Sequence, residues 1–348
     1  MATISGIRGM LLEEAVLYLL RISGYHTLEK VDPSDLTITG DCYSGLKVLG
    51  RGGLHQIDAI ADFTLTPPFT YPQRLLAEAK CYSDTYSIGI EFVRNAVGVL
   101  KDVGEYWETK KGLPPKARYH YQYVLFSASK YSSEAERYAY AHDIYLVPLA
   151  KSTFLQPVIK AIRKVTTRSF GVGSRDAIEL KTTDLRRGVR ARLRNPEDRQ
   201  LSEILVDYRE VIPVLNAFCQ ECRRVNGALL ATIAGRFPIF LVPSPSLHID
   251  QLQDEYSVRI DWNERGWYLR SRGTNIFSFD LPIDVFEYYA EQGVLSPLQA
   301  LNLKEDVFSE IQAITVINNR LRIIRFRLDE EWLSRVRYRI TQIRTEER

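Results

Sequence analysis

The stretch RLLAEAKCYS, residues 74–83, has the apolar character of a buried strand yet carries Glu78 and Lys80 at its centre. Side chains alternate between the two faces of a strand, so Leu76, Glu78 and Lys80 share one face. An acid and a base placed this way most often form an ion pair on a solvated sheet. The alternative is a metal-dependent phosphodiesterase site, which requires further carboxylates nearby.

The bulk composition is that of a globular protein, with 45% hydrophobic and 26% charged residues. Its 348 residues give room for two domains. No apolar run approaches the roughly 20 residues of a membrane span, and the N-terminus lacks a signal peptide's charged start. Four cysteines provide no disulfide framework, and Cys219-x-x-Cys222 lacks further zinc ligands. A cytoplasmic protein with no membrane partner is expected.

Apolar spacing divides the first block, residues 1–150, into alternating helices and strands. Helices are predicted at 9–22, 87–107 and 132–143, and strands within 47–65 and at 74–81, 119–129 and 144–149. Strands that alternate with helices predict an α/β layer architecture with some parallel pairing.

The remainder of the chain is predicted to hold a basic connector over 151–197 and an α+β domain over 198–348. The domain is expected to begin with a long helix, 198–225, and to continue with strands at 228–235, 238–242, 255–262, 266–272 and 276–280, helices at 283–293 and 304–314, a strand at 315–328 and a helix at 330–344. No catalytic spacing is evident in it.

A second carboxylate stands on the preceding predicted strand, at Asp58. A short turn between the two strands makes them neighbours, so Asp58 and Glu78 are expected to meet at one end of a hairpin. Mg²⁺ prefers such hard oxygen ligands. Lys80 is then placed to orient or activate a water and to offset transition-state charge. Taken alone, Asp58 is weak evidence, because an aspartate near a strand end is most often a turn residue.

The order of these motifs resembles the Mrr-like branch of the PD-(D/E)XK restriction-endonuclease-like superfamily over about residues 5–150. That family has a helix bearing Phe-Glu and ending in Gly-Tyr, matched here by Leu12-Glu13 and Gly24-Tyr25. A glycine-rich turn then leads to Ile-Asp, matched by GRGGLHQID at 50–58. Glu78-Ala79-Lys80 and the FSAS…YLVPL segment at 126–149 complete the match. Leu54 and Gln56 depart from the family's usual aspartate and glycine.

The resemblance implies a mixed sheet flanked by helices and a metal site. Asp58 and Glu78 would bind Mg²⁺, for which Mn²⁺ would substitute, with the Ala79 carbonyl as a backbone ligand. Glu13 would reach the metal directly or through water, and Glu14 is its rival. Asp62 is a minor alternative to Asp58.

Positive charge is concentrated in residues 151–199, which hold 13 Lys and Arg against 5 Asp and Glu, although the whole chain carries only +3. Five arginines cluster there: Arg186, Arg187, Arg190, Arg192 and Arg194. A charge run is most often a solvated face. The alternative is that guanidinium groups bind phosphates and anchor nucleic acid.

Together these features predict a Mg²⁺-dependent endodeoxyribonuclease that acts on DNA, by family analogy in prokaryotic defence. A homo-oligomer is expected, because cutting both strands usually takes two active sites. Two alternatives stay open. The first is a nuclease subunit whose 198–348 domain docks on a protein partner, an ATPase or a sensor. The second is a non-catalytic nucleic-acid-binding module.

Overall fold

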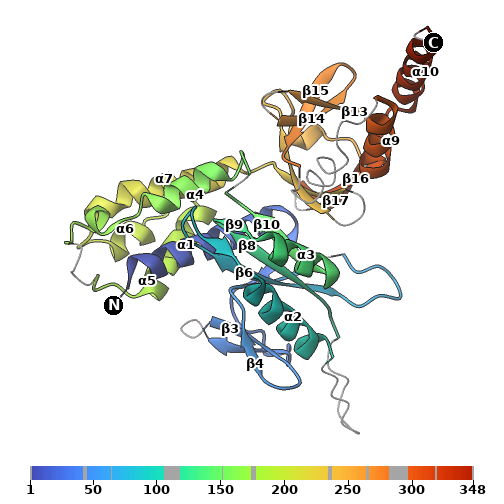
Figure 1. The fold of residues 1–348 in the computed structure, drawn as a ribbon. Helices are drawn as coiled ribbons and strands as arrows, with labels where there is room; N and C mark the ends of the chain where they lie inside the picture. The colour runs from blue at the N-terminus through green and yellow to red at the C-terminus, as the bar shows by residue number, and fades with distance from the viewer. Residues whose placement is uncertain are drawn as a thin grey trace. The chain divides into compact units, whose positions relative to one another are not determined.

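The computed structural model describes residues 2–41, 45–63, 65–105, 118–150, 152–173, 178–233, 237–263, 266–281, 297–317 and 320–346. These residues form two compact units, Met1–Asn226 and Gly227–Arg348 (Figure 1). Among the described helices, none is long and apolar enough to cross a membrane. The boundary between the units, at 226/227, lies 29 residues beyond the predicted one at 197/198. The helices between these two positions pack with earlier helices of the first unit and so belong to it.

The first unit is built on a mixed five-stranded sheet in the order β1-β5-β6-β8-β10. Its strands are β1 (Tyr25–Leu28), β5 (Ala59–Phe63), β6 (Gln73–Lys80), β8 (His120–Ser127) and β10 (Ile144–Pro148). The first three pair antiparallel, whereas β6, β8 and β10 run parallel. The predicted α/β class with partly parallel pairing is therefore confirmed.

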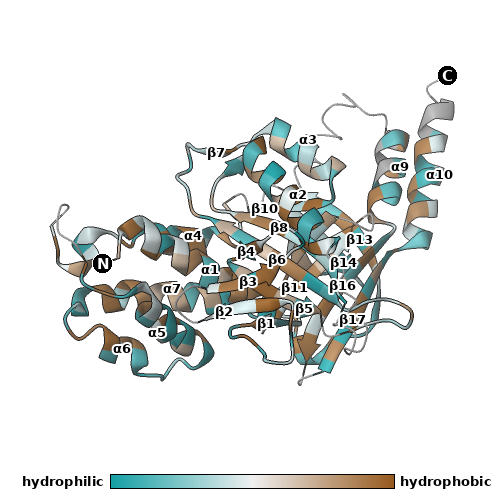
Figure 2. Cartoon of the chain, turned by 90° about the horizontal axis from the view of Figure 1, so that it is seen from below, coloured by the Kyte–Doolittle hydropathy of each residue, from teal (hydrophilic) through white to brown (hydrophobic). Residues whose placement is uncertain are grey.

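Helices cover both faces of this sheet. Leu76, Tyr123 and Leu125 share one face and pack with residues of α2 (Ile90–Gly104) and α3 (Ser133–Ala141). The alternate residues are buried on the side where α1 (Ile4–Ile22) contacts β5 and β6. Strands at the centre of the sheet are mostly brown in Figure 2, as their apolar composition requires.

The helix predicted over 9–22 begins earlier, at Ile4, because the Thr3 hydroxyl accepts a hydrogen bond from the Gly6 N–H at 3.1 Å. It ends where expected, since Gly24 adopts a positive φ of 94°.

The segment 47–65, predicted to hold a glycine-punctuated turn followed by an alternating strand, contains most of β3 (Gly45–Leu49), then β4 (Leu54–Gln56) and β5. Smaller sheets accompany the main one: β2 (Ile38–Asp41), β3 and β4 pair in sequence, and β7 (Ser87–Ile88) pairs with β9 (Lys130–Tyr131).

Asp102 holds the glycine-rich turn between β3 and β4. Its carboxylate accepts the Gly52 N–H at 2.8 Å and contacts His55 Nε2 at 2.7 Å, so a Cβ on Gly50 would lie 2.0 Å from it. His55 is thereby structural.

The second unit contains a closed seven-stranded barrel in the order β11-β12-β15-β14-β13-β17-β16. Its strands are β11 (Leu229–Ile233), β12 (Phe237–Pro243), β13 (Glu255–Asn263), β14 (Gly266–Ser271), β15 (Thr274–Phe279), β16 (Glu310–Ile317) and β17 (Arg320–Leu328). The helices α9 (Pro297–Phe308) and α10 (Glu330–Glu346) and the 3-10 turn η3 (Ile249–Gln251) accompany them.

Two predictions for this unit are wrong. The helix predicted at 304–314 ends at Phe308, and the strand predicted at 315–328 is two strands, because Ile311, Ala313 and Ile317 alternate into the barrel core. The helix predicted at 283–293 lies outside the described residues. Two tryptophans of the barrel differ in their surroundings. Trp267 packs on Phe279 and Phe308, whereas Trp262 on the neighbouring strand is 65% exposed.

The predicted connector, 151–197, is largely helical and is part of the first unit, where it packs against α1. It contains α4 (Gln156–Arg163), the 3-10 turn η1 (Thr167–Phe170) and α5 (Thr182–Arg194). The long helix predicted over 198–225 is divided into α6 (Gln200–Ile204), η2 (Arg209–Val211) and α7 (Ile212–Arg224), and Pro213 lies in the first turn of α7. Contacts of α5 and α4 with α1 join this layer to the sheet.

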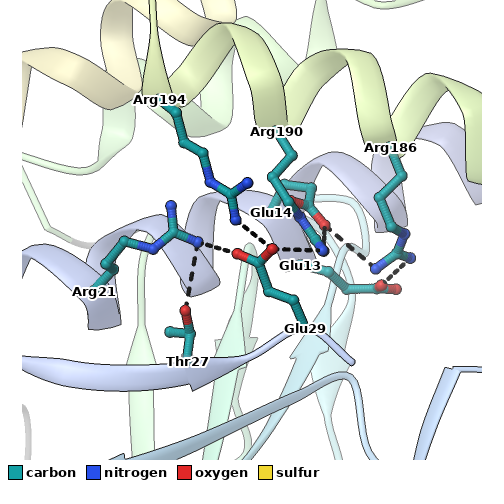
Figure 3. Close-up of polar contacts among 8 residues, drawn as sticks. All are labelled: Glu13, Glu14, Arg21, Thr27, Glu29, Arg186, Arg190 and Arg194. Atoms are coloured by element: carbon teal, nitrogen blue, oxygen red, sulfur yellow. Dashed lines mark hydrogen bonds and ion pairs between the residues drawn. The ribbon is translucent and has the colours of Figure 1, made fainter. Parts of the chain in front are cut away.

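An ion-pair network joins α5 to α1 and to the end of β1 (Figure 3). We call it the α1–α5 clamp, and it consists of Glu13, Glu14, Arg21, Glu29, Arg186, Arg190 and Arg194. Glu14 is only 1% exposed, and Arg190 binds it through Nε at 2.8 Å and Nη2 at 2.6 Å. Arg186 contacts Glu13 at 2.5 Å and Glu14 at 3.4 Å. Bidentate guanidinium–carboxylate pairing is strong and directional.

The clamp continues at Glu29, which follows β1. Its carboxylate pairs with Arg21 at 2.5 Å, with Arg190 at 3.3 Å and with Arg194. Three of the five clustered arginines therefore neutralise carboxylates of their own chain. Arg187 is 63% exposed and pairs with Asp184, whereas Arg192 donates to the Pro196 carbonyl. A nucleic-acid contact by this cluster stays a prediction, but Arg186, Arg190 and Arg194 do not form the unpaired cationic surface on which it rested.

We expect Arg190→Gln to lower the free energy of unfolding by about 3 kcal/mol, because it strips the main partner from a buried carboxylate. Arg187→Gln, on the exposed side of the same helix, should change it by about 0.5 kcal/mol or less. Urea unfolding followed by circular dichroism measures both. Equal midpoints for the two variants would show that the clamp contributes nothing to stability.

Candidate active site

The site begins with the register between β5 and β6. Ala59 pairs with Ala77, so Asp58, one residue before β5, stands opposite Glu78. The Asp58 Oδ2 atom accepts a hydrogen bond from the Ala79 N–H at 2.9 Å. The predicted meeting of Asp58 and Glu78 at one end of a hairpin is therefore present.

Glu78 is held by two donors. Tyr123 on β8 donates its hydroxyl proton to Oε2 at 2.7 Å, and the Lys80 ammonium binds Oε1. The ammonium also lies 5.5 Å from the centroid of the Phe92 ring. Glu78 and Lys80 thus share one face, as the alternation of a strand predicts, and they form an ion pair there.

Tyr123 is a site residue that the sequence reasoning missed. It is 2% exposed, and burial beside the Glu78 carboxylate raises the pKa of its phenol. The hydroxyl therefore keeps its proton and donates it to Glu78. Only the alternating tyrosines of YHYQY, 119–123, offered a signal, and using it required the register between β6 and β8.

The carboxyl group of Asp58 is electrostatically strained. Burial, followed by repulsion from Glu13 and Glu78, raises the pKa of Asp58 to about 6, against the opposing effects of the Ala79 N–H and Lys80. Its ionisation therefore costs folding free energy as the pH rises through about 6. A cation bound beside it would offset that cost.

The pKa of Lys80 is also raised, which for a lysine favours the charged form. Burial favours the neutral amine, but the hydrogen bond and charge of Glu78, together with the charge of Asp58, outweigh it and raise the pKa of Lys80. The side chain is therefore a fixed ammonium at neutral pH.

The geometry distinguishes Glu13 from its neighbour Glu14. Glu13 lies close enough to Asp58 for its charge to raise the pKa of that residue, while its Oε2 atom binds Arg186. Glu14 is buried in the α1–α5 clamp instead. Of the two, Glu13 is the one whose charge acts on Asp58.

Asp62, the minor alternative, is engaged elsewhere. Buried Arg74 binds both of its oxygens, at 2.6 and 2.7 Å, and also pairs with Asp35 at 2.7 Å. Asp62 therefore has a structural role.

The residues present fit a Mg²⁺ ion held by few protein ligands. Within the described part of the chain, no three His, Cys, Asp or Glu side chains gather closely enough to form a metal site by themselves. Mg²⁺ keeps several waters and commonly uses one or two carboxylates. Asp58 and Glu78 provide two carboxylates whose charges repel each other. The Ala79 carbonyl stays a predicted ligand.

Three solved structures resemble the chain at low TM-scores. AF1548, a crystallised protein of unknown function, has a TM-score of 0.31 and 18% identity over 63% of this chain and 98% of its own. The MspJI restriction endonuclease, in complex with a 27-mer oligonucleotide, has a TM-score of 0.24 and 15% identity over 46% of this chain and 32% of its own. The DNA modification-dependent restriction endonuclease AspBHI has a TM-score of 0.24 and 17% identity over 49% of this chain and 37% of its own.

No family model and no curated protein matches the sequence. Because the TM-scores of the solved structures are low, the function is inferred below from the chain's own site and from the motifs in its sequence.

We expect the affinity for Mg²⁺ to rise about tenfold between pH 5 and pH 7, because the ionised fraction of Asp58 rises by that factor around a pKa of about 6. Asp58→Asn should weaken binding and remove the pH dependence, and Glu78→Gln should weaken binding at every pH. Asp143→Asn, at an exposed carboxyl group, is the control. Calorimetric titration at each pH provides the measurement. Unchanged affinity in both site variants would remove these carboxylates from the coordination shell.

Proposed function

We propose that the first unit is a Mg²⁺-dependent endonuclease that hydrolyses DNA phosphodiester bonds. The observation that carries the proposal is the placement of Asp58 opposite Glu78 on consecutive strands, with Lys80 bound to the same glutamate. A solvated ion pair explains Glu78 and Lys80 alone. It does not explain why a buried aspartate stands beside them at the cost of a raised pKa.

Asp58 and Glu78 would hold the metal, with the Ala79 carbonyl as a further ligand and Glu13 reaching it through water. Bound Mg²⁺ supplies a Lewis acid that polarises the phosphoryl oxygen and makes its own water more acidic, and Mn²⁺ would do the same. Tyr123 fixes the orientation of Glu78 through its hydrogen bond.

Lys80 acts through its charge. Because its pKa is raised, it keeps its proton at neutral pH and is not a general base in the resting site. It would instead donate a hydrogen bond to a water or to a phosphoryl oxygen and offset the negative charge that develops during attack.

The choice of DNA, a role in prokaryotic defence and a homo-oligomeric state rest on the resemblance to Mrr-like endonucleases. A subunit that docks on a protein partner through the second unit would use the same site. A non-catalytic module is disfavoured, because it would have no need of Asp58, Glu78 and Lys80 together.

We expect Lys80→Ala to lower the cleavage rate at least about 100-fold while leaving the fold intact, since it removes one preorganised charge from the site. Lys101→Ala, at an exposed lysine of α2, is the matched control. The assay is nicking and linearisation of plasmid and methylated plasmid, with RNA alongside, in Mg²⁺ or EDTA. Circular dichroism checks the fold. Cleavage by Lys80→Ala at the control's rate would place the chemistry elsewhere.

A further inference from the structure

The second unit has a polar pocket of about 400 Å³ where β13 begins and β14 ends. Its lining includes three arginines, Arg259, Arg270 and Arg272, and two acids, Glu255 and Asp329. It is formed by residues of the second unit alone and shares none with the candidate active site.

Both acids of the pocket already have an ion-pair partner. Asp329 accepts the Trp332 N–H at 3.0 Å, as a cap of α10, and pairs with Arg259 Nε at 3.1 Å. Those contacts lower the pKa of Asp329. Glu255 pairs with Arg327 of the neighbouring strand β17 at 3.0 Å. The two carboxylates therefore offer little attraction to a cation.

The arginines, in contrast, keep donors available. Arg259 uses Nε for Asp329, and Arg270 uses Nε for the Gly273 carbonyl at 2.8 Å. Arg270 also forms an ion pair with Asp261, whose Oδ2 atom lies 3.6 Å from Nη1, a distance too long for a hydrogen bond. Within the described residues, no carboxylate hydrogen-bonds to the Nη groups of Arg259 or Arg270, or to Arg272.

The backbone around Arg272 gives independent support. Ser271 and Thr274 flank a two-residue turn in which Arg272 has a φ of 48° and Gly273 a φ of 84°. Asparagine, aspartate and glycine favour the first central position of such a turn, whereas a long side chain there is uncommon. An arginine held in a disfavoured conformation at the rim of a pocket suggests a function for its charge.

We propose that this pocket binds a phosphoryl group, supplied either by a nucleic-acid strand or by a free phosphate or nucleotide. Guanidinium groups match phosphoryl oxygens in geometry and form charge-assisted hydrogen bonds to them. The volume exceeds that of a phosphate alone, and pockets of roughly this size accommodate small organic ligands, so the esterified sugar has room as well. The barrel is thereby a phosphate-binding unit distinct from the nuclease site.

The test uses the full chain in EDTA, which prevents metal-dependent cleavage. Fluorescence anisotropy measures binding of a single-stranded oligodeoxynucleotide with or without a 5′-phosphate, and calorimetry measures binding of inorganic phosphate and a mononucleotide. The variant Arg270→Gln/Arg272→Asn removes two cations. Asparagine suits the turn better than arginine, whereas Arg270→Gln removes the hydrogen bond to the Gly273 carbonyl, so circular dichroism and thermal unfolding check the fold of the double variant.

We expect the double variant to bind about tenfold more weakly, as the loss of charge-assisted hydrogen bonds implies. The slope of log affinity against log salt should fall by about 0.7 for each lost contact on a single strand. Arg320→Gln, at an exposed arginine of β17 outside the pocket, should bind like the wild type.

The probes distinguish the two sources of the phosphoryl group. Binding of phosphate or the mononucleotide that the double variant loses indicates a free phosphate or nucleotide. A loss confined to the oligonucleotide indicates the backbone of a strand. The proposal is overturned if the double variant binds every probe as well as Arg320→Gln does, or if the wild type binds none of them.

Discussion

The register of β5 against β6 is the constraint on which the candidate site depends. With Ala59 opposite Ala77, the Asp58 carboxylate reaches the Ala79 N–H, and Asp58 and Glu78 lie close enough for their charges to interact. A one-residue slip would turn Glu78 and Lys80 to the other face of the sheet. Parallel pairing of β6 with β8 then brings the Tyr123 hydroxyl onto Glu78, so three strands fix one carboxylate.

Charged residues of α1 lie next to the candidate site and link it to α5. Glu13 and Glu14 are adjacent in sequence but serve different purposes, because successive helical residues point about 100° apart. Glu14 is buried under Arg190, whereas Glu13 approaches Asp58. Arg186 contacts both acids and so connects the clamp with the site. The α5 layer therefore belongs to the first unit both in packing and in electrostatics.

The sequence predicted those features that depend on residues close together in the chain. The β6 strand, the α1 helix with its end at Gly24, and the alternation of Glu78 with Ala79 all followed from periodicity and turn chemistry. Tyr123, the closure of the barrel and the β16–β17 hairpin did not, because each depends on pairing between distant segments. The metal and the restriction-endonuclease-like core stay predictions, since the site's residues fit Mg²⁺ without defining a complete ligand set.

The arginines show why a charge count along the chain misleads. Residues 151–199 are strongly basic in sequence, yet Arg186, Arg190 and Arg194 recur every four residues and so form one face of α5. The acids that form ion pairs with these arginines lie more than 150 residues earlier in the sequence: Glu13, Glu14 and Glu29. Part of the apparent excess is therefore neutralised within the first unit. Arginines of the barrel lie in a less biased stretch. Arg259 and Arg270 pair with Asp329 and Asp261, and the proposed phosphoryl site uses their remaining Nη donors together with Arg272.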